Sequence, residues 1–363
     1  MATLNELKYV AKEQVSIPEL AGRLKGEKLD TIVSRSAWHM TDDGRIYIPE
    51  LLGHAAYEAT GWAHGQIAEK LDIPKRYYDK MLAQEPSLLA QNVNTWRLRS
   101  GPNAEQNNLI RIMNGTVRAF VSDRFRALDN YEVLVAVAKA ALDVAPSIAC
   151  KRAYVTERSM HVELVDSSAV YYIDPQGNAD PYYPALSIVN SEVGYRAFEI
   201  RASFWRQVCS NGLMREFGFR QVHLGGRAEE GDYWSQRTID LSNRKTMSQI
   251  QDFVAAAFAP MYIERGINEL RGLKEKRIEQ PVKFVEASQR ILNLTEKETD
   301  SILKLLEGNT QYDYVQALTA TAQMHITPDA ETQPERKTEL EQIAGELMEK
   351  PHKWNEIERA IKA

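Results

Sequence analysis

Alternating apolar and polar residues on both sides of Asn114-Gly115 predict a β-hairpin within residues 107–127. Both turn residues tolerate the positive φ angles that a type I′ turn requires. A two-residue turn also fixes the register, so Arg111 is expected directly opposite Arg118. The hairpin face that must be buried contains Ile110, Ile112, Val117, Ala119 and Val121.

The other face of this hairpin carries Arg111 and Arg118 side by side. Like charges so placed destabilise a sheet by about 0.2 to 1 kcal/mol, and a bound anion would remove that cost. Arg124, Phe125 and Arg126 follow at once and add guanidinium groups for phosphate and an aromatic ring for a base. The pattern indicates a nucleic-acid-binding surface, or alternatively a solvated face whose arginines pair with carboxylates from elsewhere in the chain.

Upstream of the hairpin, the hydrophobic pattern changes to the spacing of helices. Asp43-Gly44 predicts a short hairpin near residues 37–48, and apolar residues then recur at helical spacing from Pro49 to about Leu71. Residues 72–74 break this helix before a second, shorter one. Two helices joined by a tight turn have the layout of a helix-turn-helix, whose second helix enters the major groove of DNA. Helix pairs that pack only for stability are commoner.

Downstream of the hairpin, the pattern predicts one helix and then a meander. The helix runs from Tyr131 to about Val144, and from residue 148 to 224 the hydrophobic period is two. Two pairs of antiparallel strands are expected around Glu157-Arg158 and Val193-Gly194, with a further strand between the pairs. A hairpin, a helix and a meander indicate an α+β fold in which helices cover one face of an antiparallel sheet.

The chain beyond Ser242 is expected to be helical. A long helix should be kinked at Pro260, and Thr295 with Glu298 has the spacing of a capping box. Thr332 with Glu335 has the same spacing, with Pro334 in the first turn of the helix. The predicted organisation is a mixed N-terminal region of residues 1–91, an α+β core of residues 92–240 and a helical region of residues 241–363.

Charge is distributed unevenly along the 363 residues. The whole chain has a net charge of −5, but residues 92–227 carry 16 basic and 13 acidic side chains, whereas residues 228–363 carry 18 and 24. Only Lys139 and Lys151 among those 16 are lysines. This arginine bias favours planar, bidentate contacts with an anion over simple solubility.

Arginine next to an aromatic residue recurs within residues 190–227, for example at Tyr195-Arg196 and Trp205-Arg206. By strand alternation, Arg196 is expected on the same side as the apolar Phe198, away from Arg201. The predicted nucleic-acid-binding residues are Arg97, Arg99, Arg111, Arg118, Arg124, Phe125, Arg126, Arg201, Trp205, Arg206, Arg220 and Arg227, and Phe120 is a further candidate for stacking.

Several segments resemble a family of phage and plasmid proteins. They are RAFVSDRFRALDNYEVL, IVNSEVGYRAFEIRASFWRQVCSNGLM, VHLGGR and QYDYVQALTATAQMH, and the likeness spans roughly residues 50 to 350. The family is the phage/plasmid-like proteins of domain of unknown function nine-three-two. The resemblance implies a role in the DNA metabolism of a mobile element and brings no catalytic residues with it. A looser likeness, of architecture alone, is to phage single-strand annealing proteins.

Motifs of the common enzyme classes are absent from the sequence. It contains no HExxH, no Walker A loop and no dinucleotide-binding GxGxxG, and no cofactor is expected. A thiol nucleophile at Cys209, activated by His161 or His223 and oriented by Asn190 or Asn211, is one open alternative. Another is a metal-dependent nuclease built from four acidic residues, namely Asp123, Asp129, Glu163 and Asp166.

The sequence therefore favours a non-enzymatic protein that binds single-stranded DNA without sequence preference and anneals it during recombination or replication. Annealing implies a homo-oligomer, in which the acidic helical regions would form the subunit contacts, and a partner nuclease is possible. No apolar run reaches the length of a membrane span and no signal peptide is seen, which favours the cytoplasm of a bacterial host. Rival interpretations are a virion structural or assembly protein, a helix-turn-helix regulator and a hydrolase.

Overall fold

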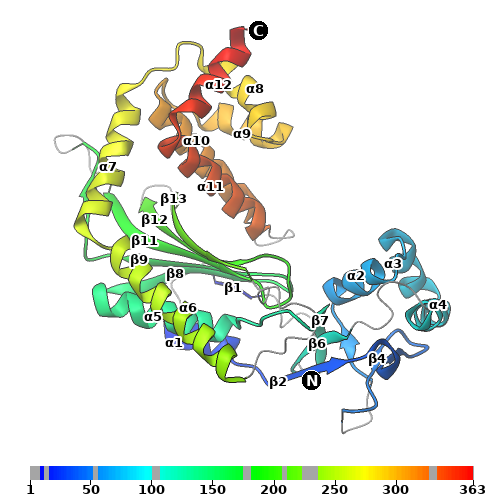
Figure 1. Cartoon of the computed structure of the whole chain (residues 1–363). Helices are drawn as coiled ribbons and strands as arrows, with labels where there is room; N and C mark the ends of the chain where they lie inside the picture. The colour runs from blue at the N-terminus through cyan, green and yellow to red at the C-terminus, as the bar shows by residue number, and fades with distance from the viewer. Residues whose placement is uncertain are drawn as a thin grey trace.

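The computed structural model is an α+β fold, as the sequence predicted, in which two sheet-containing units lie side by side (Figure 1). It describes residues 9–11, 16–51, 56–99, 107–174, 181–206, 211–222, 236–326 and 333–362. The small unit comprises the elements between residues 28 and 122, and the large unit contains the remaining elements.

The small unit is built on a four-stranded sheet in the order β2-β6-β7-β5. Its strands are β2 (Lys28–Val33), β5 (Glu58–Ala59), β6 (Asn108–Met113) and β7 (Thr116–Ser122), and a separate short hairpin is formed by β3 (His39–Met40) and β4 (Ile46–Tyr47). Its helices are α2 (Gly61–Lys70), α3 (Lys75–Gln84) and α4 (Pro86–Leu98). The predicted hairpin thus belongs to this small sheet, and the expected core of residues 92–240 is divided between the two units.

The predicted turn of the β6–β7 hairpin is confirmed, because Asn114 and Gly115 both have positive φ angles, of 50° and 74°. The predicted register holds only for the pairs next to the turn. Beyond Ile112 a β-bulge intervenes, so that Arg111 lies opposite Ala119 and Arg118 is the extra residue. The expected pairing of Arg111 with Arg118 is therefore wrong.

Helix α2 begins later than the pattern of apolar residues suggested. Thr60 is its N-cap and accepts a hydrogen bond from the Ala63 N–H, so the helix starts at Gly61 and not near Pro49. Strand β5 occupies part of the preceding segment, in parallel pairing with β7. The second predicted helix is confirmed as α3.

The large unit contains an antiparallel sheet in the order β1-β8-β9-β11-β12-β13, with β10 paired to β11. Its strands are β1 (Tyr9–Ala11), β8 (Ile148–Val155), β9 (Met160–Asp166), β10 (Tyr171–Tyr172), β11 (Pro181–Asn190), β12 (Phe198–Arg206) and β13 (Asn211–Gln221). The two predicted strand pairs are confirmed, and Gly194 provides the positive φ of 79° that the turn between β11 and β12 requires.

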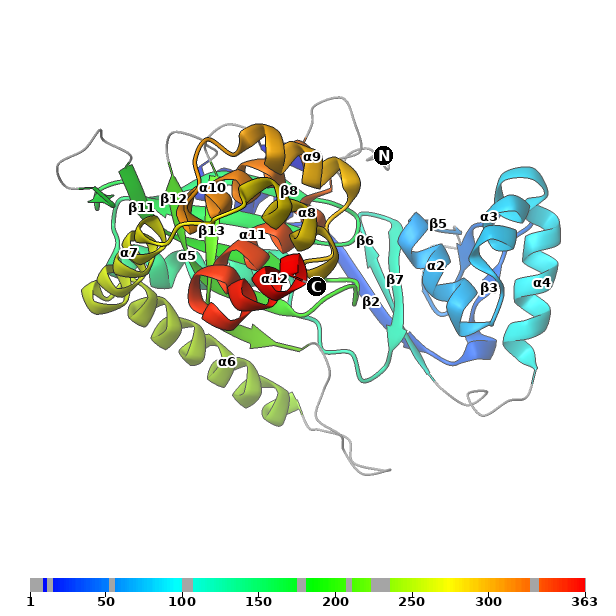
Figure 2. The same ribbon diagram turned by 90° about the horizontal axis from the view of Figure 1, so that it is seen from above.

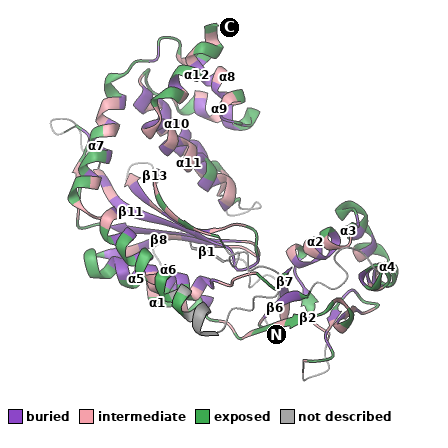
Figure 3. Cartoon of the chain, in the orientation of Figure 1, coloured by how far each residue is buried: buried purple, intermediate pink, exposed green. Residues whose placement is uncertain are grey.

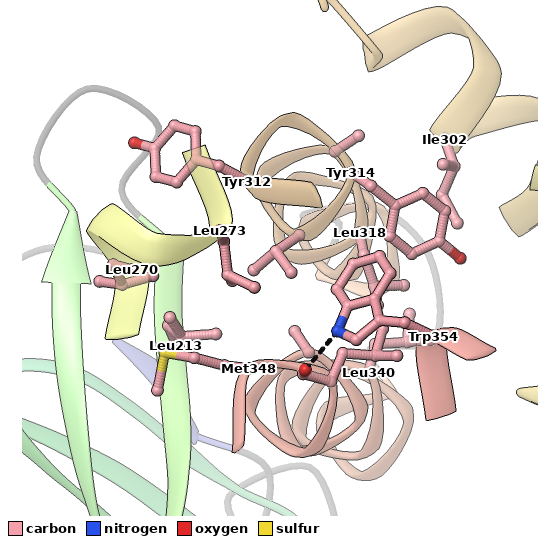
Figure 4. Close-up of a cluster of buried hydrophobic side chains, with 14 of the residues drawn as sticks. Leu213, Leu270, Leu273, Ile302, Tyr312, Tyr314, Leu318, Leu340, Met348 and Trp354 are labelled. Carbon is pink, nitrogen blue, oxygen red and sulfur yellow. Dashed lines mark hydrogen bonds between the residues drawn. The ribbon is translucent and has the colours of Figure 1, made fainter. Parts of the chain in front are cut away.

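Helices cover both faces of this sheet, whereas the sequence suggested cover on one face. The first face packs on α1 (Ile17–Leu24), α5 (Asn130–Val144) and α6 (Gln236–Ala257). The second packs on a bundle of α7 (Pro260–Glu275), α8 (Pro281–Ile291), α9 (Glu296–Leu305), α10 (Gln311–Ala322), α11 (Pro334–Glu349) and α12 (Pro351–Lys362). Figure 4 shows the core of this bundle, where Trp354 Nε1 donates to the Leu347 carbonyl.

Local signals set the ends of several of these helices. The expected kink at Pro260 is a break between α6 and α7, because Pro260 begins a new helix after Ala259. The capping box of Thr295 and Glu298 is confirmed at the start of α9. Helix α11 begins at Pro334 after Gln333, and Thr332 of the second predicted box lies outside the described residues.

Candidate nucleic-acid interface

The two units are joined by an ion pair between Arg118 of β7 and Glu192 in the β11–β12 turn. Arg118 Nη1 lies 2.6 Å from Glu192 Oε2, and both side chains are buried. The other carboxylate oxygen of Glu192 accepts the backbone N–H of Asn130 at 2.7 Å. Glu192 therefore connects the small sheet, the turn and the first residue of α5.

Arg111 is held on the same side of the hairpin by three acceptors. Its guanidinium group donates to Asp30 at 2.9 Å, to Asp129 at 2.7 Å and to the carbonyl oxygen of Glu192 at 2.8 Å. Burial disfavours its charge, but the charges of Asp129 and Asp30 outweigh burial and raise the pKa of Arg111. The guanidinium group is thus fixed and fully charged inside the protein.

The predicted nucleic-acid surface at Arg111 and Arg118 is therefore wrong. The β11–β12 turn covers this face of the hairpin, where Val193 packs with Leu109, Ala119 and Val121. Neighbouring carboxylates neutralise the arginines, as the alternative interpretation proposed, but in a buried rather than a solvated setting. Most of β6 and β7 is correspondingly coloured as buried in Figure 3.

The two candidate arginines of α4 have different environments. Arg97 is buried, donates to the Arg35 carbonyl at 2.5 Å and lies over the Trp38 ring. The prediction that Arg97 binds nucleic acid is therefore also wrong. Arg99 is exposed and stacks over Trp96, 4.7 Å from the ring centroid.

The candidates on β12 are half-buried and engaged within the large unit. Arg201 lies 2.5 Å from Glu199, Arg152 stacks over the Trp205 ring, and Arg206 donates to Gln316 of α10. Phe120, the additional stacking candidate, is almost completely buried in the core of the small unit. The first two contacts lie within the large sheet, and the contact of Arg206 joins the sheet to α10.

Two of the remaining candidates, Phe125 and Arg220, line a cleft of about 490 Å³ where the two units meet. The cleft lies between the C-terminal half of α2, the end of β7 with the turn that follows, the β11–β12 turn and the end of β13. In Figure 2, β7 lies between α2 and the strands of the large sheet. Its polar and aromatic lining includes Gln66, Glu69, Lys70, Phe125, Arg196 and Arg220.

Three cations and one carboxylate line this cleft. Burial lowers the pKa of Lys70, and the charge of Arg35 acts in the same direction. Burial also lowers the pKa of Arg196, against the opposing effect of Glu199, whose carboxylate is 3.7 Å away. Because both cations are partly desolvated, an anion bound between them would gain more than at an exposed surface.

A network of hydrogen bonds fixes the cleft walls. Trp62 and Gln66 of α2 both donate to the Val193 carbonyl, at 3.0 and 2.9 Å, and Gln66 accepts the backbone N–H of Phe120. At Gly194 an added Cβ would lie 3.1 Å from Val121 and 3.6 Å from Phe125. The residue lining the cleft here must therefore be small.

Arg124 and Arg126 flank Phe125 in the turn after β7. Arg124 is exposed, and its backbone N–H donates to the Ser122 hydroxyl at 3.0 Å. Arg126 is half-buried. The last candidate, Arg227, lies outside the described residues.

Lys70 and Arg196 are cleft residues that the sequence did not assign to the site. Strand alternation placed Arg196 with Phe198, but β12 begins at Phe198, so the alternation does not extend to Arg196. The signal available in the sequence was the glycine two positions earlier, because Gly194 shapes the turn that brings Arg196 to the cleft.

The two catalytic alternatives receive no geometric support from the part of the chain that the structure describes. No group of three or more His, Cys, Asp or Glu side chains that could hold a metal ion is found there. His161 is buried between the hydroxyls of Ser159 and Thr338, and Asn190 donates to Leu128 and Asn130. Cys209 and His223 lie outside the described residues.

A buried charge network between β9 and α11 was not anticipated from the sequence. Lys337 Nζ lies 2.5 Å from Glu163 and 2.7 Å from Glu341, and all three side chains are buried. Burial raises the pKa of Glu341 to about 7, whereas Lys337 and Arg152 outweigh burial and lower the pKa of Glu163. The network ties α11 to the sheet, and it is not part of the cleft lining.

Searches against known proteins returned no family model, no curated protein and no solved structure that matches this chain. Among the described residues, no helix has the length and apolar character needed to cross a membrane.

Proposed function

We propose that this chain is a sequence-tolerant, single-stranded DNA-binding protein that holds the strand in the cleft between its two units. The observation that carries the proposal is that Lys70, Arg196 and Arg220 line the same cleft as the half-buried ring of Phe125. Proteins that bind single strands combine a cationic groove for the backbone with aromatic rings on which bases stack. The cleft has both parts.

The aromatic ring in the cleft lining favours a single strand over a duplex. Bases in a duplex are already stacked on their neighbours, so only an unpaired base can leave the stack and lie on the Phe125 ring. Among the described residues of the lining, Glu69 is the only acidic one, against three cations, which attract the phosphate backbone.

The same chemistry supports tolerance of sequence. Guanidinium and ammonium groups contact phosphates, which carry no sequence information, and every base offers a face for stacking. The resemblance to phage and plasmid proteins supports a role in the recombination or replication of a mobile element in a bacterial cytoplasm. Strand annealing would further require several copies of the chain along one strand, with the acidic helices as subunit contacts.

Fluorescence polarisation with a labelled single strand, at about 50 and 200 mM salt, tests the proposal. We expect binding that weakens steeply with salt. Each phosphate contact to a single strand adds about 0.7 to the slope of log Kd against the logarithm of the salt concentration. Binding should also change little between oligonucleotides of different sequence. Absence of salt-sensitive binding to the single strand would reject the proposed function.

A further inference from the structure

Helices α2 and α3 form a helix pair joined by a tight turn. The proposed function of the cleft gives α3 no role. Four residues, Leu71 to Pro74, separate the end of α2 from the start of α3. Asp72 reverses the chain with a positive φ of 53°, and the Ile73 N–H donates to the Ala68 carbonyl at 2.9 Å. DNA-binding helix-turn-helix motifs join their two helices by a turn of three to four residues.

The inner face of α3 is held firmly against the small unit. Tyr78 and Met81 are buried, and the Tyr78 hydroxyl lies 2.8 Å from His64 Nδ1 of α2. Helix α3 also packs on α4. In Figure 1, α3 lies at the far end of the small unit from the large sheet. The helix is therefore rigidly positioned, with its outer face toward solvent.

That outer face carries side chains of the types that contact DNA in a groove. Arg76, Lys80 and Gln84 are exposed and lie one helical turn apart, so they share one side of α3, with exposed Tyr77 beside them. Lys75 pairs with Asp79, and for Arg76 and Lys80 no ion pair is seen within the described residues. Arginine and lysine bind guanine and phosphate, and glutamine binds adenine.

We propose that α3 is a second nucleic-acid site, which binds duplex DNA through Arg76, Lys80 and Gln84 in the major groove. The charge of the surface favours this ligand, because the helix has three cations and one carboxylate. Helix α2 serves both sites: His64 holds α3, while Gln66 and Lys70 line the cleft. The duplex site is independent of the proposed function of the cleft.

Fluorescence polarisation of the full chain with a blunt labelled duplex, at about 50 mM salt, tests this site. The Arg76→Ala, Lys80→Ala double variant should bind the duplex at least about tenfold more weakly than the wild type. A matched variant, Lys139→Ala with Arg359→Ala, removes two exposed cations from α5 and α12 and should bind the duplex like the wild type.

Three outcomes would overturn the inference. They are no duplex binding by the wild type, an unchanged affinity in the α3 double variant, and an equal loss in the matched variant. Single-strand binding, measured in parallel, separates the two sites, because the α3 variant should retain it. A wild type that binds the duplex but not the single strand would reject the proposed function of the cleft and leave the α3 site standing. Circular dichroism should show the same melting for all variants, because each altered side chain is exposed.

Discussion

Arg118 Nη1 lies 2.6 Å from Glu192 Oε2, in a buried ion pair that joins a strand of the small sheet to a turn of the large one. The same turn supplies the Val193 carbonyl, which accepts hydrogen bonds from Trp62 and Gln66. Residues of the NSEVG segment thus connect the units, and Arg196 enters the cleft directly after this connection. The ion pair and these hydrogen bonds together hold the turn that forms one wall of the cleft.

Arg118→Met should destabilise the protein by about 3–5 kcal/mol, because it leaves the Glu192 carboxylate buried without its partner. The additional change Glu192→Gln should recover part of this loss. Glutamine removes the buried charge and keeps an oxygen that can accept the Asn130 N–H. Urea unfolding of both single variants and the double variant gives the coupling energy.

The exposed pair of Arg23 and Glu19 provides the control for this series. Both side chains are half exposed, so Arg23→Met should change the free energy of unfolding by no more than about 0.5 kcal/mol. Similar losses for Arg118→Met and Arg23→Met would show that the pair between the units does not stabilise the fold.

Glu341→Gln should flatten the pH dependence of stability between about pH 4.5 and 7. Burial raises the pKa of Glu341 from 4.5 to about 7, so the folded protein binds this proton more tightly than the unfolded chain. The group therefore lowers the free energy of unfolding as pH rises through this window, by up to about 1.4 kcal/mol per pH unit. Glutamine cannot titrate but still accepts a hydrogen bond from Lys337.

Urea unfolding at intervals across this window measures the effect as the difference between wild type and variant. Glu356→Gln, at an exposed position on α12, should keep the wild-type slope. If Glu341→Gln keeps it as well, Glu341 is not protonated in the folded state at these pH values.

Gly345→Ala should destabilise the packing of α11 on β13 severely. The added Cβ would lie 1.5 Å from the Met214 carbonyl oxygen, a backbone atom that cannot move aside. The loss should exceed the roughly 1–3 kcal/mol of ordinary overpacking. Gly272→Ala in α7 is the control, since nothing lies within 4 Å of its Cβ and alanine favours the helix by up to about 1 kcal/mol. Equal thermal stability of the two variants would contradict the close approach.

Phe125→Leu should weaken single-strand binding through lost stacking, which contributes about 1–3 kcal/mol per base, or roughly five- to more than a hundredfold in Kd. Leucine preserves most of the apolar contact with the neighbouring Val193 cluster. The control is Phe219→Leu on β13. Phe219 packs against the core between the large sheet and helices α1, α5 and α6, so its replacement should leave the affinity unchanged. A Phe125 variant with wild-type affinity would remove this ring from the mechanism.

Local features of the fold could be predicted because their determinants are close in sequence. The turns at Gly44, Gly115 and Gly194 have the positive φ angles that their dipeptides indicated, and Thr295 with Glu298 forms the expected capping box. The strands and helices of the meander follow their hydrophobic periods for the same reason. A local sequence signal determines each of these elements, whichever part of the protein the element packs against.

The environments of the arginines could not be predicted, because their partners are distant in sequence. Asp30 and Glu192 each lie 81 residues from Arg111, and no local pattern shows that they meet. The bulge at Arg118 also shifts the register, and no glycine at that position indicates it in the sequence. Of the predicted site, Phe125 and Arg220 line the cleft, and Lys70 joins them only through the packing of α2 against β7.

The central claim is that the cleft between the units binds a single DNA strand, and Lys70→Gln with Arg220→Gln tests it most directly. For neither cation is an ion pair seen within the described residues, so the fold should be retained. Fluorescence polarisation with a labelled single strand should show weaker binding. The slope of log Kd against the logarithm of the salt concentration should fall by about 1.4, because two phosphate contacts are lost. Lys139→Gln with Arg359→Gln should keep both the affinity and the slope of the wild type. The same affinity and slope in the cleft variant and the wild type would contradict the account.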